Sequence, residues 1–188
     1  QWGWLAASGA AALSYGLVAQ DRWQTYIEYQ QSNTFLIQLG VNDLIQEVGD
    51  GEETAVVIGE LVETIHAAHQ EARKVDPTIQ EAYFVLVSPT DCWNPSEGEY
   101  EDNTQWVNLA EGLRALAETR EDTVYIDLRG MVEEIEGHWW DWRYKHTRDG
   151  LHPKGPYWHA NGDIRWECHP YPDGAMFYAE LVWKTISD

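Results

Sequence analysis

Three short apolar runs alternate with helix-like segments along the chain, and this alternation constrains the fold more than any other feature. The runs span 34–39 (TFLIQL), 82–87 (AYFVLV) and 123–128 (TVYIDL), and glycine or proline follows each of them. Near-continuous apolar runs of this length are typical of parallel strands that are buried on both faces. Strands and helices in alternation predict an α/β fold, a three-layer α/β/α sandwich with a mostly parallel sheet.

The segments between the runs have helical periodicity. The longest helical pattern ends before Pro77 and places apolar residues three or four positions apart at Ile58, Leu61, Val62, Ile65, Ala68 and Ala72. A later pattern would bury Trp106, Leu109, Leu113 and Leu116. Capping boxes are expected from the spacing of Asp21 with Gln24 and of Asp102 with Gln105. A last helix is expected from about 174 to 186.

The composition excludes several classes of function. A formal net charge of −20 over 188 residues lacks the basic surface that nucleic-acid binding requires. No apolar run approaches the ~20 residues that span a bilayer. With 44% hydrophobic residues the chain has enough apolar material for one folded domain, 1–188. Only four of the 12 basic residues are lysines, and this acidic, lysine-poor surface favours adaptation to high salt, although an ordinary acidic surface would have the same composition.

Candidate functional residues follow the predicted strands, where open α/β sheets bind ligands. Gly40-Val41-Asn42-Asp43 follows the first run, and Ser88-Pro89-Thr90-Asp91 follows the second. The late segment Asp149-Gly150-Leu151-His152-Pro153 places an aspartate three residues before a histidine. Such a pair can orient an imidazole as a general base.

These motifs, in this order, resemble the SGNH (GDSL-type) hydrolases, which are flavodoxin-like α/β/α esterases and lipases. Gly40-Val41-Asn42-Asp43 resembles the family's Gly-x-Asn-Asp block, and Asp149 to Pro153 resembles its Asp-x-x-His-Pro block. Trp4 to Ala10, with its turn at Gly9, is similar to the second block. The resemblance implies that Gly9 and Asn42 donate hydrogen bonds to an oxyanion, that His152 is the base and that Asp149 orients it. Asp43 is expected to be structural, and no cofactor or metal is implied.

One block of the family is missing from these residues. Gly-Asp-Ser, which carries the nucleophile on the first and central strand, does not occur in the sequence, and the chain begins with Gln1. Three explanations remain: an upstream segment, cleaved or present as a companion chain, carries the first strand; the nucleophile has been lost; or Ser8 or Ser14 replaces it. We favour the first explanation, because a missing central strand would leave neighbouring strands with unpaired edges.

Residues 137–172 form an aromatic- and histidine-rich region with little periodicity, and long irregular segments are usually functional loops. Tyr157, Trp158 and Trp166 either pack this loop or stack on sugar rings. Cys92 and Cys168 either form a disulfide over the site or are buried thiols. A metal site is the less favoured interpretation of the irregularly spaced set His138, His146, His159, Cys168 and His169.

The leading hypothesis is therefore an extracellular or surface ester hydrolase acting on a small ester or an acylated carbohydrate in a high-salt setting. The alternative is a non-catalytic binding or structural module on the same fold, at a cell or virion surface. A flavodoxin-like nucleotide binder is disfavoured, because the sequence has no glycine-rich phosphate loop.

Overall fold

A computed structural model of the chain describes residues 10–46, 48–89, 104–131, 179–180 and 182–186. Its elements in chain order are α1 (Ala12–Gly16), α2 (Gln20–Gln30), β1 (Thr34–Ile37), α3 (Val41–Ile45), α4 (Gly51–Val75), β2 (Tyr83–Val87), α5 (Thr104–Glu118) and β3 (Thr123–Ile126). Residues 128–131 form one further helical turn, and 179–180 and 182–186 are helical, as expected for the last helix.

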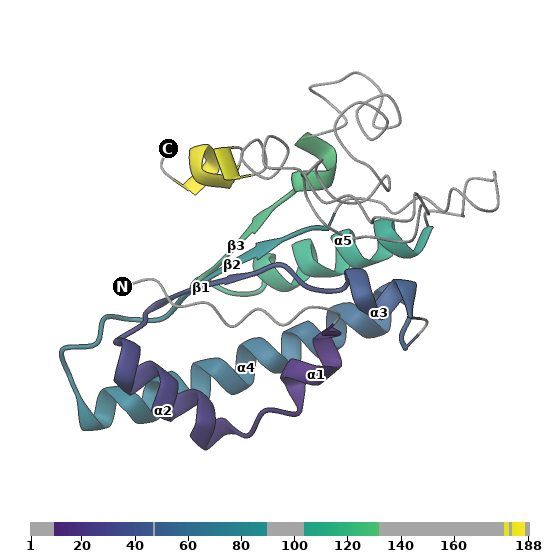
Figure 1. The fold of residues 1–188 in the computed structure, drawn as a ribbon. Helices are drawn as coiled ribbons and strands as arrows, with labels where there is room; N and C mark the ends of the chain where they lie inside the picture. Colours follow the sequence, from purple (N-terminus) through teal and green to yellow (C-terminus); the bar gives the residue numbers. More distant parts are fainter. Residues whose placement is uncertain (1–9, 47, 90–103, 132–178, 181, 187–188) are drawn as a thin grey trace, which may run out of the picture.

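The described strands form one parallel sheet in the order β1-β2-β3 (Figure 1). Leu36 of β1 pairs with Val85 of β2, and Val85 pairs with Val124 of β3. The three apolar runs are therefore strands, and the prediction of an α/β sandwich with a parallel sheet is confirmed.

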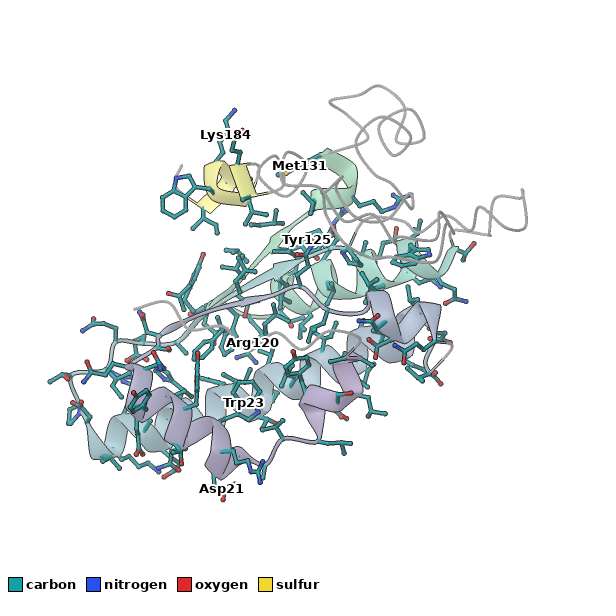
Figure 2. The ribbon with its side chains drawn as sticks, in the orientation of Figure 1. Asp21, Trp23, Arg120, Tyr125, Met131 and Lys184 are labelled. Atoms are coloured by element: carbon teal, nitrogen blue, oxygen red, sulfur yellow. The ribbon has the colours of Figure 1, made fainter. Side chains whose placement is uncertain are left out.

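Each face of the sheet packs against helices. On one face Phe35, Ile37, Phe84 and Leu86 form a large apolar cluster with residues of α2, α4 and α5. On the other face a smaller cluster of Val85, Val87, Ile126 and Leu128 packs against Met131 and against Val182 of the last helix. Trp23 of α2 belongs to the first cluster, and Met131 lies on the opposite side of the sheet (Figure 2). The sheet is thus the middle layer of a sandwich.

Burial on both faces was the wrong expectation for β1. Phe35 and Ile37 are buried, but Leu36 is 48% exposed. In β2, by contrast, every residue from Phe84 to Val87 is buried. The apolar cluster on the second face of the sheet contains residues of β2 and β3 but none of β1, so among the described residues nothing apolar covers Leu36 there.

Helix α4 matches its predicted periodicity, because all six apolar positions of the pattern are buried. The helix begins with a capping box in which Asp50 accepts from the Glu53 N–H and Glu53 accepts from the Asp50 N–H. This box provides side-chain acceptors for two backbone N–H groups at the helix start that have no partner within the helix. The Asp50-x-x-Glu53 spacing is present in the sequence, but this cap was not among the predicted ones.

Of the two capping boxes that we predicted, the one at Asp21 and Gln24 is wrong, and the one at Asp102 and Gln105 lies partly outside the described residues. Helix α2 begins at Gln20 with Ala19 as its N-cap, and the Gln24 amide donates to Glu28 instead of returning to the helix start. The Gln105 amide oxygen accepts from the Gly51 N–H at 2.8 Å, so Gln105 links α5 to the start of α4. Asp102 lies outside the described residues.

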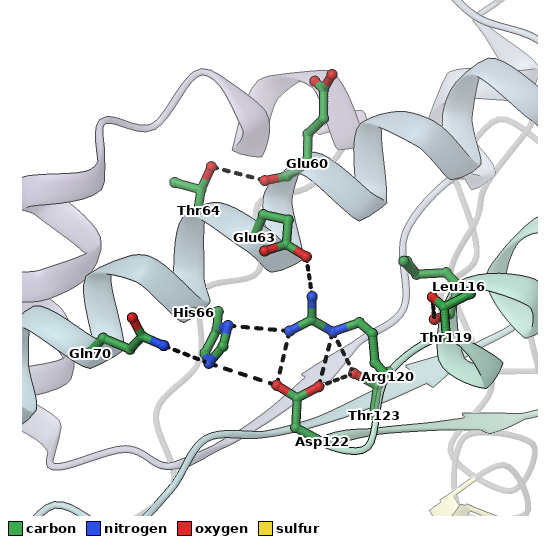
Figure 3. A network of polar contacts seen from close by, with 10 residues as sticks. All are labelled: Glu60, Glu63, Thr64, His66, Gln70, Leu116, Thr119, Arg120, Asp122 and Thr123. Carbon is green, nitrogen blue, oxygen red and sulfur yellow. Dashed lines mark hydrogen bonds and ion pairs between the residues drawn. The ribbon is translucent and has the colours of Figure 1, made fainter.

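A polar cluster joins α4 to the amino-terminal end of β3 (Figure 3). The Arg120 guanidinium donates to Glu63 of α4 and to Asp122, whose Oδ2 is 2.9 Å from Arg120 Nη2. Burial alone would raise the pKa of Asp122, but hydrogen bonds from Arg120 and Thr123 outweigh it and lower that pKa. This cluster lies at the opposite end of the strands from the predicted site, so we regard it as structural.

In the part of the chain that the structure describes, no helix is both long enough and apolar enough to cross a membrane.

Candidate active site

The first part of the candidate site is the turn that follows β1. Gly40 has φ 107° and is the N-cap of α3, a backbone conformation that disfavours residues with a Cβ atom. Space excludes a side chain as well, because a Cβ atom on Gly40 would lie 2.5 Å from Leu109 Cδ2. The turn therefore requires glycine, and it places Asn42 and Asp43 in the first turn of α3.

Asn42 and Asp43 both bind the segment that leads into α1. Asn42 Nδ2 donates to the Ala10 carbonyl oxygen at 3.0 Å. Asp43 Oδ2 accepts from the Ala12 N–H at 2.7 Å, and Asp43 is only 3% exposed. Residues more than 30 positions apart in the sequence thus meet at the carboxyl end of β1.

The contact with Ala10 determines which way the Asn42 amide faces. A carbonyl oxygen only accepts hydrogen bonds, so the amide nitrogen, and not the amide oxygen, must face Ala10. The nitrogen carries two hydrogens and this contact uses one of them. The arrangement holds an amide N–H donor in a defined orientation, which is the property an oxyanion site requires.

A second polar cluster occupies the carboxyl ends of β2 and β3. Asp127 accepts from Arg114 Nη2 at 2.8 Å, from the Gly130 N–H at 3.0 Å and from Ser88 Oγ at 3.4 Å. Ser88 is fully buried, and its Oγ accepts from the Arg129 N–H at 3.1 Å. This cluster fixes the exits of both strands, and burial makes Ser88 unsuitable as a nucleophile.

Tyr125 lies beside this second cluster. Its hydroxyl donates to Asp127 Oδ1 at 3.4 Å, and the Arg114 guanidinium lies 5.4 Å from the centre of its ring. Burial raises the pKa of Tyr125, so the hydroxyl stays protonated and donates at neutral pH. Ser88 was predicted as a residue at a strand end, whereas Asp127 was not, although it also directly follows a strand.

The sequence matches a family model over most of its length. The model of the GDSL-like lipase/acylhydrolase family covers residues 2–164. The chain belongs to the GDSL-like lipase/acylhydrolase family. Neither the comparison with curated proteins nor the comparison with solved structures returned a match.

Membership of the GDSL-like family supports a hydrolase and agrees with the resemblance noted in the sequence. The matched range includes Gly9, Asn42, Asp149 and His152, and it ends before Trp166 and Cys168. Of these residues the structure describes Asn42 alone. The roles predicted for all of them stay predictions.

The remaining predicted site residues lie outside the described residues. They are Gly9, Asp149 and His152, the aromatic residues Tyr157, Trp158 and Trp166, and the two cysteines Cys92 and Cys168. The histidines weighed as metal ligands fall there too. Among the described residues, no group of three or more His, Cys, Asp or Glu side chains could hold a metal ion.

Proposed function

We propose that the protein is a serine ester hydrolase of the SGNH type. The observation that carries this proposal is the Asn42 amide, oriented by the Ala10 carbonyl at the carboxyl end of β1, in a chain of the GDSL-like lipase/acylhydrolase family. An oriented N–H donor at that place suits the stabilisation of an oxyanion. One such donor typically lowers the barrier by about 3–4 kcal/mol.

In the proposed mechanism a serine hydroxyl attacks the ester carbonyl while His152 removes its proton and Asp149 holds the His152 tautomer. The carbonyl oxygen becomes an oxyanion, to which the Asn42 amide and the Gly9 N–H donate. The intermediate then expels the alcohol, which takes the proton from His152. Water, activated by His152, hydrolyses the remaining serine ester and restores the enzyme.

The serine of this mechanism is proposed to come from a Gly-Asp-Ser segment outside the 188 residues, upstream in the same protein or in a companion chain. Such a segment would bring one more strand to the sheet. The outer side of β1 offers a place for it, because among the described residues β1 pairs with β2 alone.

Covalent labelling tests the proposal directly. The full-length protein should react with a fluorophosphonate and hydrolyse p-nitrophenyl acetate, and mass spectrometry should locate the label on a serine of a Gly-Asp-Ser segment. Asn42→Ala should lower kcat about 100- to 1000-fold. Asn33→Ala is the matched control, since it makes the same change at the opposite end of β1 and should leave kcat unchanged.

The alternative is a non-catalytic module on the same fold, which the absence of Gly-Asp-Ser from these residues favours. It predicts neither labelling nor turnover, whatever the ester. Labelling that disappears in His152→Ala would exclude this alternative.

We further propose that the substrate is an acylated carbohydrate outside the cell. The aromatic residues Tyr157, Trp158 and Trp166 follow His152 closely in the sequence, and aromatic faces suit the apolar faces of sugar rings. A Cys92–Cys168 disulfide would suit an oxidising, extracellular setting. Acetylated sugars should therefore be hydrolysed with a lower KM than p-nitrophenyl acetate, and a non-reducing peptide map should contain the Cys92–Cys168 pair.

A further inference from the structure

Helix α1 has no residue of its own that can cap its start. Its N-cap is Ala11, which offers no side-chain acceptor to the first turn. The cap comes instead from Asp43, which lies 31 positions along the chain from Ala12 and accepts its N–H at 2.7 Å. A carboxylate is favourable there, because the first turn of a helix presents orphan N–H groups and a partial positive charge.

The same segment holds the Asn42 amide. Ala10 O, which accepts from Asn42 Nδ2, is only two residues from Ala12 N, which donates to Asp43. Neighbouring residues of α3 thus bind neighbouring residues of the chain that enters α1. The two hydrogen bonds, together with the backbone of residues 10–12 and 42–43, close one ring. The position of the Ala10 carbonyl therefore depends on the bond that Asp43 makes with Ala12.

Burial protects the Asp43–Ala12 bond of this ring, whereas the Asn42–Ala10 bond is only partly buried. Ala12 is fully buried, Ala11 is 7% exposed and Asp43 is 3% exposed, so water has little access to the Asp43–Ala12 bond. The Asp43 backbone is held as well, since its carbonyl accepts from the Val48 N–H at 3.0 Å. The ring therefore fixes both partners of the Asn42–Ala10 contact.

We propose that Asp43 is a positioning residue, whose carboxylate holds the Ala10 carbonyl in place and thereby aims the Asn42 amide at the reacting ester. Asp43 touches no substrate atom in this proposal. The inference rests on the proposed function for its catalytic consequence, whereas the positioning of the Asn42 amide can be measured without activity.

Kinetics of the full-length protein give the first test. Asp43→Ala should lower kcat about 10- to 100-fold with little change in KM, since a misaimed oxyanion donor affects the transition state more than substrate binding. Asp43→Asn keeps an oxygen that can accept the Ala12 N–H, so it should restore most of kcat. In an Asn42→Ala background, Asp43→Ala should have almost no further effect.

A matched control is available at α4. Asp50 is also an aspartate that caps a helix start, and its Oδ1 accepts from the Glu53 N–H at 2.8 Å. Asp50→Ala removes the same charge and a similar cap without touching residues 10–12. It should therefore leave kcat unchanged, even if it lowers stability.

Nuclear magnetic resonance gives the second test, which does not depend on activity. The side-chain amide signals of Asn42, assigned by their loss in Asn42→Ala, should shift in Asp43→Ala and stay in place in Asp50→Ala. Unmoved Asn42 signals, or a kcat for Asp43→Ala equal to that of Asp50→Ala, would overturn the positioning role. If the wild type shows no turnover, or Asn42→Ala turns over as fast, the proposed function fails, and the amide signals still decide the role of Asp43.

Discussion

At the scale of single residues, Gly40 carries the strictest requirement in the described part of the site. Gly40→Ala would force a methyl group into a left-handed backbone with φ 107° and against Leu109 Cδ2 at 2.5 Å. We expect a loss of about 2–5 kcal/mol in the free energy of unfolding, from backbone strain and overpacking together. Urea unfolding measures this loss.

Gly59→Ala is the control for this change. Gly59 lies within α4, where an added Cβ atom would meet Leu116 at an ordinary 3.6 Å. Alanine is favoured over glycine in a helix by about 1 kcal/mol, so this variant should be at least as stable as the wild type. Equal stability of the two variants would contradict the argument for Gly40.

His69 predicts how stability depends on pH. The side chain is 1% exposed and packs edge-on against Phe35, and its Nε2 has no hydrogen-bond partner among the described residues. Burial, followed by the charges of Arg73 and His66, lowers the pKa of His69 below 6.5, while Glu81 and a backbone hydrogen bond to Gln80 oppose this. The unfolded chain therefore binds a proton more readily than the folded one.

The consequence is a loss of stability in mild acid. The neutral His69 side chain makes its full contribution to the free energy of unfolding above pH 6.5. As the pH falls from 6.5 through the pKa of His69 in the folded protein, that free energy decreases by at most about 1.4 kcal/mol per pH unit. His69→Met cannot take up this proton, so its unfolding free energy should fall less between pH 7 and pH 5.5. Parallel curves for the two proteins would show that His69 does not contribute.

At the scale of elements, the polar cluster around Arg120 ties α4 to the start of β3. The Arg120 side chain is 11% exposed, and Asp122 is 25% exposed. Arg120→Leu would remove the guanidinium from the mostly buried Asp122 carboxylate and leave it only the Thr123 hydroxyl and His66, which should cost about 1–3 kcal/mol. Adding Asp122→Asn to Arg120→Leu removes the carboxylate charge and should recover part of this loss. Urea unfolding of the wild type, both single variants and the double variant measures the coupling.

Arg73 provides the comparison for the Arg120 pair. It pairs with Glu81, whose side chain is 81% exposed, and exposed pairs contribute less than about 1 kcal/mol. Glu81→Leu removes this pair and keeps the hydrogen bond from Arg73 Nε to the Ile79 carbonyl, so it should cost much less than Arg120→Leu. If both changes cost the same, burial would not be the source of the Arg120 contribution.

Some features of the helices and strands could be predicted from the sequence, and others could not. The periodicity of α4 and the three strand runs were predictable, because local patterning reports which side faces a core. The exposure of Leu36 could not be predicted, since it depends on which other residues pack against that face of β1 and not on the sequence of β1 itself. The capping box predicted at Asp21 failed because α2 already begins at Gln20, with Ala19 as its N-cap, so Asp21 lies inside the helix.

The candidate site was predictable in part for a similar reason. A motif after a strand indicated Asn42, but the partner of its amide is the backbone carbonyl of Ala10. Every residue has such a carbonyl, so the residue type at position 10 does not indicate this contact. Asp43 was expected to be structural, and the cap that it provides to α1 agrees with this. Long-range contacts with main-chain atoms are the part that the residue pattern does not encode.

At the scale of the whole molecule, the net charge of −20 predicts a strong dependence of stability on salt. Like charges repel one another in the compact state, and raising the salt from 0.1 M to 1 M shortens the screening length from about 10 Å to about 3 Å. The free energy of unfolding should therefore rise between 0.1 M and 2 M KCl. Potassium chloride is the appropriate salt, because sulfate would also strengthen apolar burial.

A charge-reduced variant separates screening from other effects of salt. Glu60, Glu111 and Glu118 are exposed glutamates of α4 and α5. Changing all three to glutamine takes the net charge from −20 to −17, should raise stability at 0.1 M KCl and should flatten the salt dependence. Urea unfolding at each salt concentration measures both effects. A wild-type free energy of unfolding that stays level or falls up to 2 M KCl would contradict adaptation to high salt. An unchanged salt dependence in the variant would show that repulsion between like charges does not cause the salt dependence.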